Sequence, residues 1–445
     1  MVQAAKRWKL RSRSRVGLCL CALAVLATAA FFWKDICLWR ARVNLAARQH
    51  QKAASWVDRS RWLATAPDPA RSLLDLRIAR RLLEFDRVES LLKLASTLDV
   101  SEKDLRRERL LAMAQTNQFH QMEGQWPELL NDPRDDGPEI AQAYYTWAML
   151  HHQLPLAEKT LTLWHEDYPR DAEPLFLKGC FYQAIDQWEA AVPAYRDALK
   201  LEPHNDRFRL ALARALQTRL QTEPAISLYQ ESLQEHPDNL RALQGLAECE
   251  AARGNIDSAL GLLKRAIAIS PDDFEVQKTC GEMLLAAGQA KAAVEILEKA
   301  YLAVPEHANL ANSYARALKE CGRNDEAERL FAFVVEARPA LDELVKLEKS
   351  LQHQPDNLAL RMKIASITAR YVSRRDAIRW YENLILIVPN YRPAKQALAE
   401  LHDQVNDVAK PAARSEKAHG ITGTNDSVVE SPSGHPGQAL DTSSR

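Results

Sequence analysis

The sequence predicts an all-α fold, namely an α-solenoid of helix-turn-helix repeats that follows a single N-terminal transmembrane helix. Three observations support this prediction: prolines recur at a constant spacing, small residues recur with the same spacing, and one segment near the N-terminus carries no charge. The composition agrees, because Ala, Leu, Glu, Arg and Lys dominate the middle of the chain and only 14 of the 445 residues are glycine. Such a composition favours helices over strands.

The repeat period is defined by prolines that lie 34 residues apart. They are Pro169, Pro203, Pro237, Pro271, Pro305 and Pro339. Pro389 keeps the same distance from Pro355. Because proline lacks an N–H group and clashes with the preceding turn of a helix, we expect each of these prolines to end the second helix of a unit.

Small residues keep the same step. Alanines lie twelve residues before the prolines, at Ala157, Ala191, Ala225, Ala259, Ala293, Ala327 and Ala377. A second small position lies twelve residues earlier, at Gly179, Ala213, Ala247, Gly281, Ala315 and Ala365, and a large apolar residue follows each alanine from Ala191 on by four positions. This pattern predicts two closely packed helices in each unit. Gly254, Gly288 and Gly322 are expected to end first helices in the left-handed conformation.

With these positions the chain resembles the tetratricopeptide repeat family, a helix-turn-helix repeat of the same length. Units 172–205, 206–239, 240–273, 274–307, 308–341 and 358–391 match closely, and unit 138–171 matches with Tyr145 at a small position. Segments 36–69, 72–102 and 103–137 are helical and repeat-like, with a less regular register. We therefore predict divergent repeats over 34–137 and a regular array over 138–341.

The C-terminal part of the chain departs from the regular array. Pro355 follows Pro339 by 16 residues, and Leu344, Leu347 and Leu351 share one helical face, which predicts a half-repeat helix over 342–357. A final repeat with a closing helix is expected over 358–401. Residues 406–445 contain no aromatic residue and are rich in Ser, Gly, Thr and Pro, a composition typical of a disordered tail.

The N-terminus predicts membrane attachment. Residues 16–33 carry no charge, and as a helix of about 27 Å they nearly span a hydrocarbon core of about 30 Å. Residues 1–15 contain six Lys or Arg and no acid, so they are expected to stay in the cytoplasm and to place the repeats on the periplasmic or exoplasmic side. A cleaved signal peptide ending near Ala29 is the alternative, which would leave a secreted soluble scaffold.

Charge and motifs argue against several classes of function. Outside residues 1–33 the chain has an excess of six acidic residues and no basic stripe, so nucleic-acid binding is not expected. The sequence has no G-x-G-x-x-G, phosphate-loop, H-E-x-x-H or G-x-S-x-G motif and no C-x-x-C pair. We therefore expect no catalysis, no metal, no cofactor and no small-molecule substrate.

The resemblance implies that the first helix of each unit lines a concave face, where its second, fifth, ninth and twelfth positions point outward. The candidate partner-binding residues are Arg207, Leu210, Arg214, Gln217, Arg241, Gln244, Lys278, Asn309, Asn312, Arg316 and Lys319. We expect a membrane-tethered scaffold that binds a partner protein or peptide there. The alternative is an accessory docking subunit of an envelope polysaccharide assembly or export system, or of a secretion system.

Overall fold

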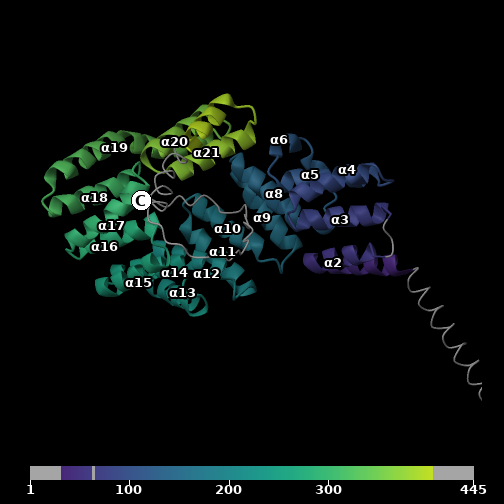
Figure 1. The fold of residues 1–445 in the computed structure, drawn as a ribbon, viewed down its shortest axis with the longest axis horizontal. Helices are drawn as coiled ribbons and strands as arrows, with labels where there is room; N and C mark the ends of the chain where they lie inside the picture. Colours follow the sequence, from purple (N-terminus) through teal and green to yellow (C-terminus); the bar gives the residue numbers. More distant parts are fainter. Residues whose placement is uncertain (1–31, 63–65, 404–445) are drawn as a thin grey trace, which may run out of the picture. The chain divides into compact units, whose positions relative to one another are not determined.

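The computed structural model describes residues 32–62 and 66–403, and every regular element in these ranges is a helix (Figure 1). The predicted tail over 406–445 and the predicted transmembrane segment, apart from Phe32 and Trp33, lie outside these ranges. None of the helices described is both long and apolar enough to cross a membrane. The chain divides into two compact units, residues 1–140 and residues 141–445.

Unit 1 consists of short antiparallel helices that pack in sequence order. They are a helix over 32–46, α2 (His50–Ser60), α3 (Pro69–Arg81), α4 (Phe85–Ser96), α5 (Glu102–Gln115), α6 (Phe119–Met122), α7 (Trp126–Leu130) and the 3₁₀ turn η1 (Arg134–Asp136). The start of α3 shows why these helices begin where they do. The Asp68 carboxylate accepts a hydrogen bond from the Arg71 N–H, and Pro69 occupies the first helical position.

Unit 2 is the regular array. Its helices are α8 (Gly137–Leu150), α9 (Leu154–Asp167), α10 (Glu173–Ala184), α11 (Trp188–Leu201), α12 (Asp206–Thr218), α13 (Thr222–Glu235), α14 (Leu240–Ala252), α15 (Ile256–Ile269), α16 (Phe274–Ala286), α17 (Ala290–Ala303), α18 (Ala308–Glu320), α19 (Asn324–His353), α20 (Leu358–Tyr371), α21 (Arg374–Ile387) and a closing helix over 392–403. The first residues of α8 belong to unit 1.

The small residues of the repeat pattern lie at the contacts between helices, as predicted. Ala191, Ala225, Ala259 and Ala293 are all fully buried. At Gly281, a Cβ atom would lie 2.3 Å from the Cγ atom of Leu297, so only glycine allows this approach. The turn glycines are also confirmed, because Gly254, Gly288 and Gly322 have φ values of 85°, 71° and 79°.

Tyr145 occupies the position at which the other regular units have a small residue. Its ring is nevertheless buried, with 7% of the residue exposed. The hydroxyl group donates a hydrogen bond to the carbonyl oxygen of Leu177, 3.5 Å away. The first unit of the array therefore accommodates a large side chain at this contact.

The prediction that Pro339 ends a helix is wrong, and so is the separate half-repeat helix over 342–357. α19 continues through Pro339 for 30 residues in all, from Asn324 to His353. A proline in a helix interior leaves the carbonyl group four residues earlier without its N–H partner. Here that group belongs to Val335, a residue that is 67% exposed, so water can replace the missing donor.

Candidate functional site

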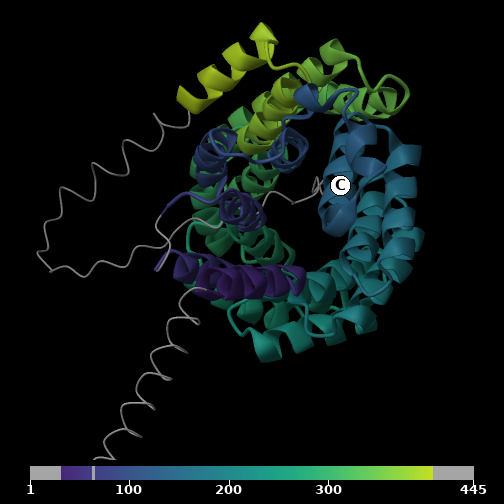
Figure 2. The same cartoon turned by 90° about the vertical axis from the view of Figure 1, so that its right-hand side faces the viewer.

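The first helices of consecutive repeats form the inner side of unit 2. α12 contacts α14, α14 contacts α16 and α16 contacts α18, whereas the described second helices α11, α13, α15 and α17 make no comparable contacts with one another. Elements on the inside of a curved stack lie closer together than those on the outside. Figure 2 shows the helices of unit 2 following such a curve. The open sides of α10, α12, α14, α16 and α18 are called the concave face below.

Hydrogen bonds between polar side chains join neighbouring helices across the concave face. Gln217 of α12 donates to Glu248 of α14 at 2.7 Å, and Gln244 donates both to Glu248 at 3.2 Å and to Thr279 of α16 at 3.0 Å. Ser313 of α18 donates to Glu282 of α16 at 2.9 Å. These bonds hold the first helices in a fixed arrangement, so the face is preformed.

Arg207, one of the predicted cations, is held by contacts with three side chains of α10 and α12. Its guanidinium group donates to both carboxylate oxygens of Glu173 in α10, at 2.6 and 2.5 Å. It also lies 4.1 Å from the ring centroid of Phe176 and 5.3 Å from that of Phe208. A paired and stacked arginine of this kind mainly stabilises the packing of α10 against α12.

Four other cations of the concave face are exposed and form no ion pair with any residue that the structure describes. They are Arg214, Arg241, Arg316 and Lys319. Lys278 differs, because it is 2.8 Å from Glu275 and its side chain is only 17% exposed. Of the uncharged candidates, Asn309 is exposed, whereas Leu210, Gln217, Gln244 and Asn312 are half-buried.

The acids of the concave face all have partners. Glu173 pairs with Arg207 and Glu275 pairs with Lys278. Glu248 and Glu282 accept the side-chain hydrogen bonds described above. Four cations and two acids, Glu248 and Glu282, thus have no ion pair among the described residues, so the excess charge of this face is positive, although the sequence alone gave a mixture of signs.

The structure adds residues that the sequence analysis did not select. Glu173, Phe176, Cys180 and Gln183 of α10 hold the same repeat positions as the candidates of α12. Counting these positions from residue 172 would have found them. Burial raises the pKa of the Cys180 thiol to about 11, and the hydrogen bond from Tyr195 only partly opposes this. Cys180 is therefore a neutral packing residue at neutral pH.

Unit 2 also contains a contact between its two ends. Arg361 of α20 donates to the carbonyl oxygen of Leu150, the last residue of α8, at 2.8 Å, and to that of Pro355 at 2.8 Å. Arg361 is only 2% exposed, and burial lowers its pKa to about 10 while Asp356 opposes the shift. A cation at a helix C-terminus stabilises carbonyl groups that have no partner within the helix.

Arg209 of α12 holds the same repeat position as Arg361 but has different hydrogen-bond partners. Arg209 also donates to a repeat proline, Pro203, but its remaining donors bind the carboxylates of Asp206 and Glu235. Arg361 forms no ion pair within the described ranges, so its free donor reaches a helix 211 residues away along the chain. Burial also lowers the pKa of the adjacent His152 to about 4, and Arg361 adds to this shift.

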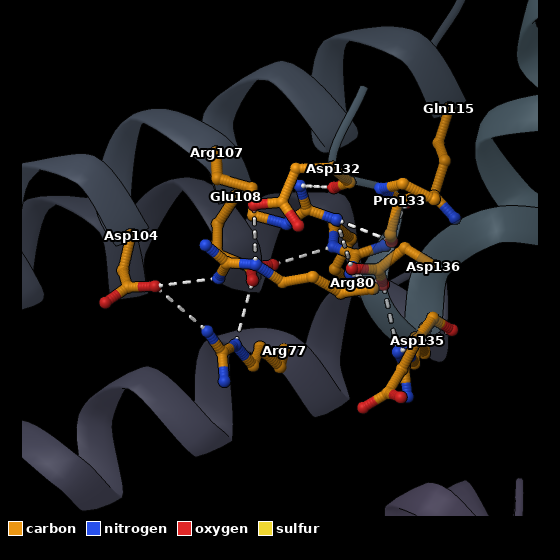
Figure 3. Close-up of polar contacts among 12 residues, drawn as sticks. Arg77, Arg80, Asp104, Arg107, Glu108, Gln115, Asp132, Pro133, Asp135 and Asp136 are labelled. Atoms are coloured by element: carbon orange, nitrogen blue, oxygen red, sulfur yellow. Dashed lines mark hydrogen bonds and ion pairs between the residues drawn. The ribbon is translucent and has the colours of Figure 1, made fainter. Parts of the chain in front are cut away.

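Unit 1 contains a buried ionic network (Figure 3). Arg80 of α3 is fully buried and bonds Glu108 of α5 at 2.8 Å and Asp136 of η1 at 2.6 Å. Arg81 and Arg107 also bond Asp136, at 2.9 and 3.2 Å. Burial raises the pKa of Asp136, but the nearby arginines outweigh burial and lower it to about 2. Asp136 is therefore ionised at neutral pH.

This network is structural and not catalytic in its geometry. The guanidinium group of Arg80 is paired with Glu108 and Asp136, and Arg80 and Glu108 are at most 1% exposed, so no substrate can reach them. Nowhere in 32–62 or 66–403 do three or more His, Cys, Asp or Glu residues gather in a way that could hold a metal ion. The network fixes η1, which immediately precedes α8, against α3 and α5.

A family model for the tetratricopeptide repeat matches residues 221–282 and 284–346, which cover α13 to α18 and most of α19. The chain contains tetratricopeptide repeats. Proteins built from such repeats use extended concave surfaces to bind other proteins. A search of curated proteins finds no match to this tetratricopeptide-repeat protein.

Several solved structures are similar to parts of this tetratricopeptide-repeat protein. TTC0263, a thermophilic TPR protein from Thermus thermophilus, is 22% identical with a TM-score of 0.32, covering 44% of this chain and 98% of its own. MamA from Desulfovibrio magneticus is 18% identical with a TM-score of 0.35, covering 37% and 93%. YrrB, described as a TPR protein with an unusual peptide-binding site, is 18% identical with a TM-score of 0.32, covering 45% and 95%.

Proposed function

We propose that this tetratricopeptide-repeat protein is a membrane-tethered scaffold whose concave face binds an extended, acidic segment of a partner protein. The observation that carries the proposal is the set of exposed cations without ion pairs on α12, α14 and α18, namely Arg214, Arg241, Arg316 and Lys319. The acids beside them are already engaged within the protein. A partner with carboxylates would therefore supply the charges that the face lacks.

The arrangement of the first helices suits an extended partner. Each first helix contributes a few outward side chains, and the same positions recur in consecutive repeats. Side-chain hydrogen bonds across the face already fix the helices, so binding requires little further ordering of the protein. Affinity then arises from many modest contacts along the partner, and it should fall as salt screens the exposed charges.

Reversing the four free cations should abolish partner capture. The full chain with Arg214, Arg241, Arg316 and Lys319 changed to Glu is compared with the native chain in affinity isolation from membranes, followed by mass spectrometry. Exposed ion pairs contribute about 0.2–1 kcal/mol each, so four reversed contacts should weaken binding at least about tenfold. Partners whose yield falls in the variant are those that bind the concave face.

A matched control uses four exposed cations on second helices, Arg196, Lys264, Lys291 and Lys299, also changed to Glu. This control introduces the same change in net charge away from the concave face. We expect it to recover the same partners as the native chain. Equal recovery by both variants, or equal loss in both, would remove the concave face from the proposal.

The tether is the second part of the proposal, and it is supported by the uncharged sequence of residues 16–33 and the basic residues before it. The full chain should remain in the membrane pellet after alkaline carbonate extraction, and removal of residues 1–33 should release it. N-terminal sequencing of the cellular protein provides the decisive measurement. A mature chain that begins near Ala30 would show a secreted soluble scaffold and overturn the tether.

A further inference from the structure

The helix over 32–46 has two apolar faces, of which only one is used by unit 1. Cys37, Leu38, Ala41 and Leu45 are buried, and all but Cys37 belong to the cluster formed with α2 and α3. On the opposite side Ile36, Trp39 and Val43 are 44%, 56% and 46% exposed. The first face fixes the helix in unit 1, so the second face is presented as a rigid surface.

The exposed residues follow a heptad spacing. Ile36 and Val43 are seven residues apart, and Trp39 lies three positions after Ile36 and four before Val43. This is the a, d, a spacing of a coiled coil, with β-branched residues at both a positions. In parallel coiled coils, β-branched residues at a combined with Leu at d favour two strands, and here Trp39 takes the d position.

Charges at the edges of the stripe complete the pattern. Asp35 takes position g and Arg40 takes position e of the next heptad. Both are exposed, and neither forms an ion pair with another described residue, although Arg40 lies 5.3 Å from the ring centroid of Trp39. In a parallel pair of helices, position g of one strand faces position e of the other. Asp35 would then meet Arg40 of a second copy, twice in a symmetric dimer.

We propose that the helix over 32–46 pairs in parallel with the same helix of a second copy of this chain. The stripe is a narrow a/d seam bordered by charges, whereas a helix that lies on a lipid surface has a broad apolar face. The proposal does not depend on the concave face. Packing against unit 1 already orders the helix. The free energy of pairing across two heptads therefore does not have to offset the entropy cost of forming the helix.

The mass of the full chain in detergent, measured by analytical ultracentrifugation over a range of protein concentrations, tests the pairing. The native chain should form dimers, and Ile36→Lys combined with Val43→Lys should leave monomers. Both side chains face solvent, so the helical circular dichroism signal should not change. A native chain that is monomeric at every concentration would overturn the proposal, and so would a dimer that the two lysines leave intact.

Charge exchange tests the parallel register. Asp35→Arg and Arg40→Asp should each weaken the dimer by about tenfold, because each places like charges opposite one another. An equal mixture of the two variants should restore dimers, because the mixed pair again brings opposite charges together. Arg42→Asp is the matched control, since position g at 42 faces Ala47 of the second copy and the dimer should persist. A mixture that stays monomeric would contradict the register.

Lipid contact is the competing outcome. If the exposed face lay on the bilayer, the full chain in nanodiscs would stay monomeric. A nitroxide label at position 43 would then become accessible to oxygen dissolved in the lipid. In the dimer the spectrum of the label would instead be broadened by the label of the second copy, because equivalent a positions lie next to each other in a parallel pair. The first result would overturn the proposal and the second would support it.

Discussion

Replacing Arg80 by methionine should destabilise unit 1 by about 3–5 kcal/mol, the usual effect of removing one member of a buried ion pair. Arg80 is fully buried, and its guanidinium group bonds both Glu108 and Asp136. Methionine fills part of the same volume, so the loss reports mainly on the ion pairs that Glu108 and Asp136 lose, since Glu108 keeps only Arg77 and Asp136 keeps only Arg81 and Arg107. Hydrogen exchange of the amides in α3 and α5 measures the effect within unit 1.

The control is an arginine of α5 that lies at the surface. Arg106 pairs with Glu128 at 3.0 Å, but its side chain is 53% exposed, so Arg106→Met should change the stability by no more than about 1 kcal/mol. The double variant Arg80→Met, Glu108→Gln should recover part of the loss, because it removes a buried carboxylate that has lost one of its two cations and keeps only Arg77, 2.9 Å away. If Arg80→Met were no more destabilising than Arg106→Met, the buried network would not contribute to the stability of unit 1.

The regular array could be predicted from the sequence because its signals are local and repeated. Proline, glycine and small residues constrain the backbone and the distance between helices wherever they occur, and a fixed step shows that they act together. Gly254 and Gly281 behave as this pattern requires. Pro339 does not, because an exposed stretch of helix can tolerate a proline when water replaces the lost donor.

The ion pairs of unit 1 and the hydrogen bond from Arg361 to Leu150 could not be predicted, because they join residues that are distant in sequence. Arg80 and Asp136 are 56 residues apart and Arg361 and Leu150 are 211 apart, and the chemistry of each residue alone would suit a solvated surface. Arg207 and Glu173 are different, since they hold equivalent positions in consecutive repeats. Comparing equivalent positions would have found that pair and shown which cations remain free.

Pairing within the concave face also changes which residues a partner can use. The candidates from the sequence include Arg207 and Lys278, yet both already bind glutamates of the same face. Their exchange for Glu would break internal contacts, and any loss of binding would then be ambiguous. The free cations avoid this difficulty, which is why the proposed test excludes Arg207.

Gly245→Ala should destabilise unit 2 by about 1–3 kcal/mol, although alanine is the better helix former by about 1 kcal/mol. A Cβ atom at residue 245 would lie 2.2 Å from the Cζ atom of Tyr229. The ring cannot easily move, because Tyr229 is only 3% exposed and its hydroxyl group donates to Gln217 at 2.8 Å. Thermal unfolding of the full chain measures the change.

Gly261→Ala is the matched control in the next helix. A Cβ atom there would meet nothing within 4 Å, so alanine should stabilise unit 2 by about 0.5–1 kcal/mol through its helix propensity alone. Changing Tyr229 to Leu, the residue at the equivalent positions 263 and 297, should relieve the clash in Gly245→Ala. Two alanine variants of equal stability would mean that close packing does not require glycine at 245. Changes in stability of opposite sign would show that the contact between Gly245 and Tyr229 sets the spacing of α13 and α14. Gln217 accepts a hydrogen bond from Tyr229 and donates one to Glu248, so the same contact supports the concave face.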